Sequence, residues 1–219
     1  MMLGIMAQRK QLRSWPDIFQ MILFMGDKLS DLRIVCDDKE FLVHKLILSC
    51  RSDFFNALFS TQESQANFKE ANASVLKIEH TDPDTMEKLL KFIYTSQIRA
   101  EDIDCRLLML ADMYNIKALV TICFEYLEIN MHVENVMEIT YAAYLTNNQN
   151  LMEKASKFIF GNRGSKHIQH CPFWEELKEK NPTVAVKVLE FIVRFNSILF
   201  FDRESIEQES LKVLELLEF

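Results

Sequence analysis

The chain has 219 residues, 49% of them hydrophobic and 26% charged, and its formal net charge is −7. These proportions are typical of one or two compact domains and exclude a disordered chain. No basic stretch interleaves with aromatic residues, which argues against binding of DNA or RNA. The longest apolar runs, such as residues 21–25, are too short to span a bilayer, so no membrane contact is expected.

The chain contains five cysteines, and none forms a Cys-x-x-Cys pair. Residues 1–6 do not have the layout of a signal peptide. An odd number of cysteines without a secretory signal is typical of reduced thiols. The sequence therefore predicts a cytoplasmic or nuclear protein.

The N-terminal part divides into a short tail, residues 1–14, and a predicted helix that begins at Trp15-Pro16-Asp17. This helix is apolar on nearly every side, so it must bury its outer face as well as its inner one. The alternatives are a helix of the core and a helix at an interface. We favour a homodimer interface, because an exposed apolar patch marks association. Its predicted contact residues are Ile18, Phe19, Ile22 and Leu23.

The hydrophobic period changes once within residues 30–59. Apolar and polar residues alternate over 32–36 and again over 41–43, with polar residues 37–39 between them, which predicts a two-stranded hairpin with one buried face. After His44 the apolar residues fall at helical spacings. Arg51-Ser52-Asp53 predicts a break and an N-cap between two short helices.

The remainder of the chain is mainly helical in pattern. A polar segment, residues 60–74, precedes a predicted third strand over 75–78, and Asp82-Pro83 has the pattern of an N-cap followed by proline at the first helical position. Helices are predicted over 83–95, 103–114, 116–131, 133–145, 150–160, 172–180 and 183–195. The acidic amphipathic segment 202–219 is expected to pack on the helices before it.

The order and spacing of several short motifs resemble the BTB (POZ) domain. They are Ser30-Asp31, His44-Lys45, Arg51-Ser52 and Phe54-Phe55, with FIYTSQI and LADMYNI further along. The resemblance implies an α+β fold over residues 15–130, in which a small β-sheet is flanked by a cluster of α-helices. VENVMEITYAAYL resembles the opening of a BACK domain, which implies an all-α, BACK-like extension over residues 131–219.

The same resemblance suggests roles for particular residues. In BTB domains the N-terminal helix packs across a two-fold axis, and Asp31 and Lys45 match positions of a charged pocket near that interface. For a buried pair of opposite charges, removal of one partner lowers the stability of the fold more than removal of both. Phe68-Lys69-Glu70 resembles the loop with which BTB adaptors contact cullin-3, with Phe68 as the anchor and Glu70 as the orienting carboxylate. The alternative is a surface loop whose Phe68 folds back onto its own domain.

The sequence offers little for catalysis. Hydrolytic catalysis needs a nucleophile, a base and an orienting acid, and by residue type alone these could be Cys50, His44 and Asp31. His44 is better interpreted as a structural histidine. His167, His170 and Cys171 form a compact cluster, but a zinc site needs a fourth ligand, so a polar loop is the better interpretation. We therefore predict no enzyme activity, no cofactor, no metal and no small-molecule substrate.

The leading hypothesis is a homodimeric protein-interaction adaptor. It would be a substrate-recruiting or scaffold subunit of a cullin-3 RING ubiquitin ligase, with cullin-3 and an unidentified protein substrate as partners. The alternative is a BTB scaffold outside the ubiquitin pathway, which assembles other proteins such as transcriptional regulators or forms mixed dimers.

Overall fold

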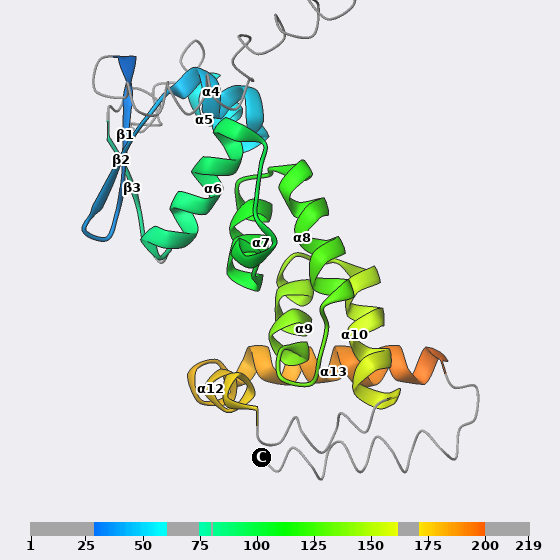
Figure 1. The fold of residues 1–219 in the computed structure, drawn as a ribbon. Coiled ribbons are helices and arrows are strands. Elements are labelled where there is room, and N and C mark those ends of the chain that lie inside the picture. The colour runs from blue at the N-terminus through cyan, green and yellow to red at the C-terminus, as the bar shows by residue number, and fades with distance from the viewer. Residues whose placement is uncertain (1–28, 61–74, 80, 162–170, 200–219) are drawn as a thin grey trace, which may run out of the picture. The chain divides into compact units, whose positions relative to one another are not determined.

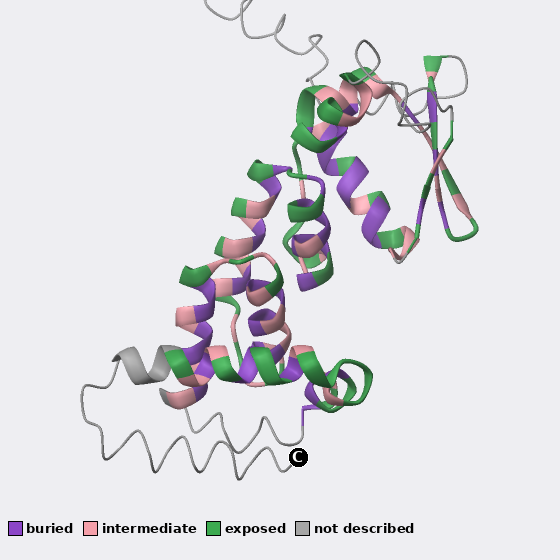
Figure 2. Cartoon of the chain, turned by 180° about the vertical axis from the view of Figure 1, so that it is seen from behind, coloured by how far each residue is buried: buried purple, intermediate pink, exposed green. Residues whose placement is uncertain are grey.

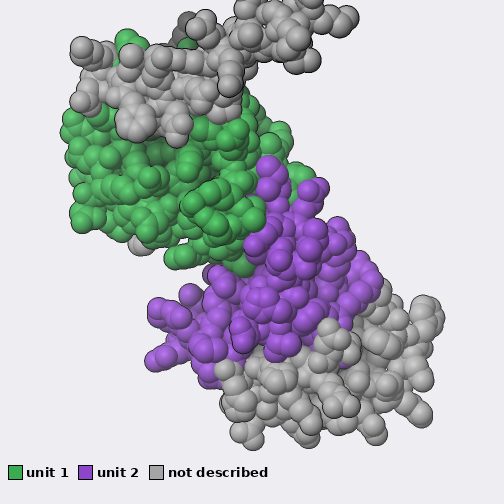
Figure 3. Space-filling view, in the orientation of Figure 1, with its two compact units in different colours: residues 1–121 green, residues 122–219 purple. Residues whose placement is uncertain are grey.

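A computed structural model describes residues 29–60, 75–79, 81–161 and 171–199 of the chain (Figure 1). The chain divides into two compact units, residues 1–121 and residues 122–219, which Figure 3 shows in separate colours. Within the described ranges, no helix is long and apolar enough to cross a membrane.

The first unit contains a three-stranded sheet in the order β2-β1-β3. β1 (Leu32–Cys36) and β2 (Lys39–Val43) pair antiparallel and form the predicted hairpin, with Asp37 in the left-handed region at φ 51°. β3 (Val75–Ile78), the predicted third strand, pairs parallel with the other edge of β1. The alternation in β1 is confirmed, because its first, third and fifth side chains are buried and Arg33 is exposed.

Two short helices follow the hairpin, α4 (Lys45–Arg51) and α5 (Asp53–Ser60). The break between them falls at Ser52, as predicted, and the Ser52 hydroxyl accepts a hydrogen bond from the Phe55 N–H at 3.1 Å. The predicted N-cap is therefore present.

Next come α6 (Pro83–Thr95), the 3₁₀ turn η3 (Ala100–Asp102), α7 (Cys105–Met113) and α8 (Lys117–Ile129). α6 lies between the sheet and α7 in Figure 1, and Figure 2 shows buried residues along most of its length. The helix predicted over 103–114 was placed two residues too early. Asp104 is extended and caps α7, so the helix begins at Cys105.

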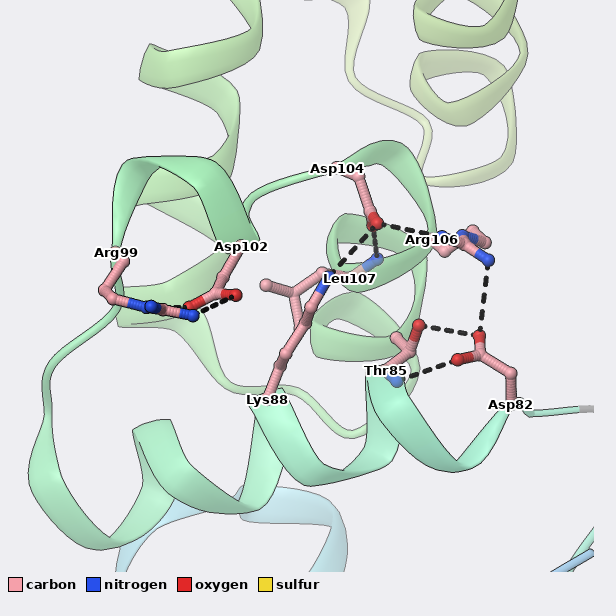
Figure 4. A network of polar contacts seen from close by, with 8 residues as sticks. All are labelled: Asp82, Thr85, Lys88, Arg99, Asp102, Asp104, Arg106 and Leu107. Carbon is pink, nitrogen blue, oxygen red and sulfur yellow. Dashed lines mark hydrogen bonds and ion pairs between the residues drawn. The ribbon is translucent and has the colours of Figure 1, made fainter.

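The starts of α6 and α7 are held by a polar network (Figure 4). The Asp82 carboxylate accepts hydrogen bonds from the Thr85 N–H at 2.9 Å and the Thr85 hydroxyl at 2.7 Å, and the Asp104 carboxylate accepts one from the Leu107 N–H at 2.8 Å. Arg106 reaches both aspartates. Partial burial alone would raise the pKa of Asp82, but the bonds from Thr85 and the charge of Arg106 outweigh it and lower that pKa.

The second unit is built from α9 (Val136–Leu145), α10 (Gln149–Gly161), α12 (Pro172–Lys180) and α13 (Pro182–Leu199), around a core that contains Trp174. Helix α9 begins three residues later than predicted, because Asn135 closes a turn by accepting from the His132 N–H at 2.8 Å. Cys171 is buried in this core. His167 and His170, the other members of the cluster weighed as a metal site, lie outside the described residues.

Candidate protein-interaction site

The structure describes Asp31 and Lys45 among the predicted site residues. The predicted dimer-interface and loop residues lie outside the described residues and remain predictions: Ile18, Phe19, Ile22, Leu23, Phe68 and Glu70.

Asp31 and Lys45 are brought together by a contact between a carboxylate and the backbone. The Asp31 carboxylate accepts a hydrogen bond from the Lys45 N–H at 2.8 Å. His44, the N-cap residue of α4, makes no side-chain cap bond, so Asp31 supplies the cap from fourteen positions earlier. In the single chain Asp31 is exposed and Lys45 is half-buried, with its ammonium 5.5 Å from the centre of the Phe59 ring. The resemblance to the BTB family implied that these residues lie close together in a charged pocket, and that pocket remains a prediction; the capping role of Asp31 was not predicted.

His44 is joined to Tyr94 of α6. The His44 N–H donates to the Tyr94 hydroxyl at 2.9 Å, and the His44 Nδ1 lies 2.8 Å from the same oxygen. Tyr94 is fully buried, and this burial raises its pKa to about 12. The pair ties the end of the hairpin to α6, which is a structural role for His44.

An exposed aromatic lies at the start of α5. Phe54 is 42% exposed, and its ring packs edge-on against Tyr114 at a centroid distance of 5.2 Å. Phe55, its buried neighbour, stacks on the Tyr114 ring at a centroid distance of 4.9 Å. Met113, which precedes Tyr114, is 63% exposed. The start of α5 and the end of α7 therefore expose two large apolar side chains beside one buried tyrosine.

Polar contacts join the start of α5 to the end of α7 and to Lys117, the first residue of α8. The Ser52 hydroxyl donates to the Tyr114 carbonyl at 2.5 Å, and the Lys117 ammonium lies 2.7 Å from the Asp53 carboxylate. The Asn115 amide also donates to that carboxylate, at 3.3 Å. Asn115 has φ 51°, the left-handed conformation in which asparagine commonly ends a helix. We define the Phe54 surface as Asp53, Phe54, Met113, Asn115 and Lys117.

Sequence reasoning missed the Phe54 surface. Its two halves are about sixty positions apart, and a hydrophobic period is a local signal that does not report which distant segments meet. The Phe54-Phe55 pair belongs to one of the motifs in the sequence, but the pattern does not show which of the two rings is buried.

Comparison with known proteins shows the family to which this chain belongs. The BTB/POZ domain family matches residues 22–131, half of the chain, so the chain belongs to that family. The predicted family and the α+β fold with a helical extension are thereby confirmed. BTB domains are protein-interaction modules rather than enzymes, and the chain is an interaction protein in this general sense.

Three relatives are 26–28% identical to this chain over the residues that align. Protein maternal effect lethal 26 of Caenorhabditis elegans is 27% identical over 177 residues, which cover 80% of this chain and 43% of that protein. Kelch-like protein 40 of Xenopus tropicalis is 28% identical over 134 residues, which cover 61% of this chain and 21% of that protein. TD and POZ domain-containing protein 4 of Mus musculus is 26% identical over 168 residues, which cover 75% of this chain and 44% of that protein. The chain spans less than half the length of these curated relatives.

A solved structure, the BTB domain of zebrafish PATZ1, aligns with 52% of this chain and 89% of its own. The TM-score is 0.43 and the sequence identity 22%.

Proposed function

We propose that this chain is a non-catalytic, homodimeric adaptor that binds cullin-3 of a RING ubiquitin ligase through its BTB unit. Membership of the BTB family and the Phe68-Lys69-Glu70 motif support the proposal. The observation that carries it furthest is the Phe54 surface, which presents an aromatic ring and a methionine to solvent. Helix α5 carries Phe54 and ends at Ser60, and the segment with the motif follows directly in the chain.

The composition of this surface suits a protein partner. Aromatic residues and methionine are enriched at the centres of interfaces, where a few of them carry most of the binding energy. The Asp53–Lys117 pair is exposed and would lie at a polar rim, where charges act mainly on association rate and specificity. The contact of Phe54 with Tyr114 holds the ring before binding, which reduces the entropy lost on association.

The second unit has a separate task in this proposal. Its helices would form the BACK-like extension, and the substrate would bind to this extension, to residues 1–14 or to a partner protein. Such a complex would act in the cytoplasm or the nucleus.

The proposal is tested by titration calorimetry of the full chain with the N-terminal region of cullin-3. Phe68→Ala should weaken binding by about 2 kcal/mol or more, roughly thirtyfold, because a buried aromatic anchor is lost. Glu70→Ala should change the association rate and its salt dependence more than the affinity. The dimer and its melting temperature should stay nearly unchanged.

Lys69→Ala is the matched control, because the motif places no demand on its middle position. Undiminished binding by Phe68→Ala would contradict the site assignment. Absence of binding by the wild-type chain would favour the alternative, a BTB scaffold outside the ubiquitin pathway.

A further inference from the structure

We infer that Ser52 is a positioning residue for the Phe54 surface and acts through the backbone of Tyr114. The inference rests on the proposed function, because it takes cullin-3 as the protein that occupies this surface. Ser52 is only 2% exposed, so it cannot form an appreciable contact with a bound protein. Any effect of Ser52 on binding must pass through the residues that it holds.

The Ser52 hydroxyl makes two buried hydrogen bonds with different consequences. It accepts from the Phe55 N–H at 3.1 Å, which fixes the first turn of α5. It also donates to the Tyr114 carbonyl at 2.5 Å, which joins that turn to the end of α7, 62 positions later. Both bonds are shielded from water. In the protein interior a hydrogen bond is stronger, and a polar group left without its partner costs more free energy.

The second bond determines how the two halves of the Phe54 surface meet. Phe54 stands in the turn that Ser52 caps, and its ring packs on Tyr114. Met113 and Asn115 flank Tyr114 in the chain, so the anchored carbonyl fixes the backbone from which both side chains project. Loss of the Ser52 hydroxyl would let the start of α5 and the end of α7 shift against each other.

The other polar ties to the start of α5 are weaker. The Asp53 carboxylate accepts from the Asn115 amide and pairs with Lys117, the first residue of α8, but these contacts are exposed, and exposed ion pairs contribute little to holding a structure in place. The ring contacts of Phe54 and Phe55 with Tyr114 are less directional than a hydrogen bond. The Ser52 hydroxyl is thus the buried, directional link between the halves.

The experiment measures binding of the full chain to the N-terminal region of cullin-3, well below the melting transition. Ser52→Ala should weaken the affinity about threefold to tenfold, because side chains that were held before binding must now be ordered on binding. Ser52→Thr keeps a hydroxyl and should restore the affinity to within about twofold of wild type. Ser49→Ala is the matched control, since the Ser49 hydroxyl donates to the Lys45 carbonyl at 2.8 Å, a bond within α4 that does not join α5 to α7.

A purely structural role gives a different result. If Ser52 only stabilised the fold, Ser52→Ala would lower the melting temperature and leave the affinity unchanged while the chain is folded. That result would overturn the inference and leave the proposed function intact, whereas a wild-type chain that does not bind would overturn the proposed function. Should Ser52→Ala fail to fold, Ser52→Gly replaces it, because glycine is tolerated at an N-cap and also lacks the hydroxyl; wild-type affinity of Ser52→Gly would refute the inference equally.

Discussion

Replacement of Trp174 by alanine should destabilise the second unit selectively. The Trp174 side chain is fully buried, and it packs in a core to which Ala155, Ile159 and Val188 also belong. Truncation of a buried tryptophan to alanine typically costs about 3–5 kcal/mol. A domain of about 100 residues is stable by only about 5–15 kcal/mol, so the variant should lose a large part of that stability and melt at least about 12 °C lower.

Trp174→Phe separates the packing of the ring from its polar group. The indole N–H of Trp174 is buried and has no hydrogen-bond partner within the described part of the chain. An unpaired buried donor costs about 1–3 kcal/mol, and phenylalanine removes this cost while it keeps much of the ring. The phenylalanine variant should therefore lose less than half the stability that the alanine variant loses.

Differential scanning calorimetry of the full chain is the appropriate assay, because two units can melt in separate transitions. The transition of the second unit should move and that of the first should remain. Binding of cullin-3 should also persist in Trp174→Ala at low temperature, since the Phe54 surface belongs to the first unit. An unchanged thermogram for Trp174→Ala would refute the packing of Trp174 in the core. Equal losses of stability in Trp174→Ala and Trp174→Phe would refute the claim that the unpaired indole N–H is costly.

Two further predictions concern the first unit. Ile22→Asp combined with Leu23→Asp should give monomer or aggregate in analytical ultracentrifugation, because charge is placed on the predicted dimer helix; a wild-type chain that is a clean monomer at micromolar concentration would contradict the dimer. Asp82→Ala should cost about 1 kcal/mol at pH 7 in urea unfolding, through loss of the cap on α6. Because the folded-state pKa of Asp82 is lowered, the stabilisation by its carboxylate is present above the unfolded pKa of about 4 and is lost as the pH falls through the folded value. A difference in unfolding free energy between wild type and Asp82→Ala that is equally large at pH 2 and pH 7 would show that the carboxylate charge is not its source.

The parts of the fold that the sequence predicted are those encoded by a few neighbouring residues. The alternation in β1, the cap at Ser52 and the Asp82-Pro83 start of α6 are local signals, and all three are present in the structure. The start of α7 was predicted wrongly because Ile103 extends the apolar period, whereas the extended backbone of Asp104 sets the boundary. A side-chain cap outweighs a period of apolar residues at a helix end.

The contacts of the candidate site could not be predicted in this way. Asp31 with the Lys45 backbone, His44 with Tyr94 and Ser52 with Tyr114 join residues that are 14, 50 and 62 positions apart. A hydrophobic period specifies which face of an element is apolar, but not which element covers that face. For the motifs that fall outside the described residues, the resemblance to the family remains the basis of the prediction.

The exposed apolar residues on α4 and α5 relate the fold to protein association. Each helix has one buried residue, Leu48 in α4 and Phe55 in α5, while Leu46 is 74% exposed and Phe54 is 42% exposed. Helices that bury so little gain little stability from the core of their own unit, and most helical stability in proteins comes from tertiary packing. Leu46 and Phe54 are the exposed large apolar side chains of these two helices, and apolar side chains of this kind form the centres of protein interfaces. In a family of interaction modules, such helices are better explained by association than by the stability of the isolated unit.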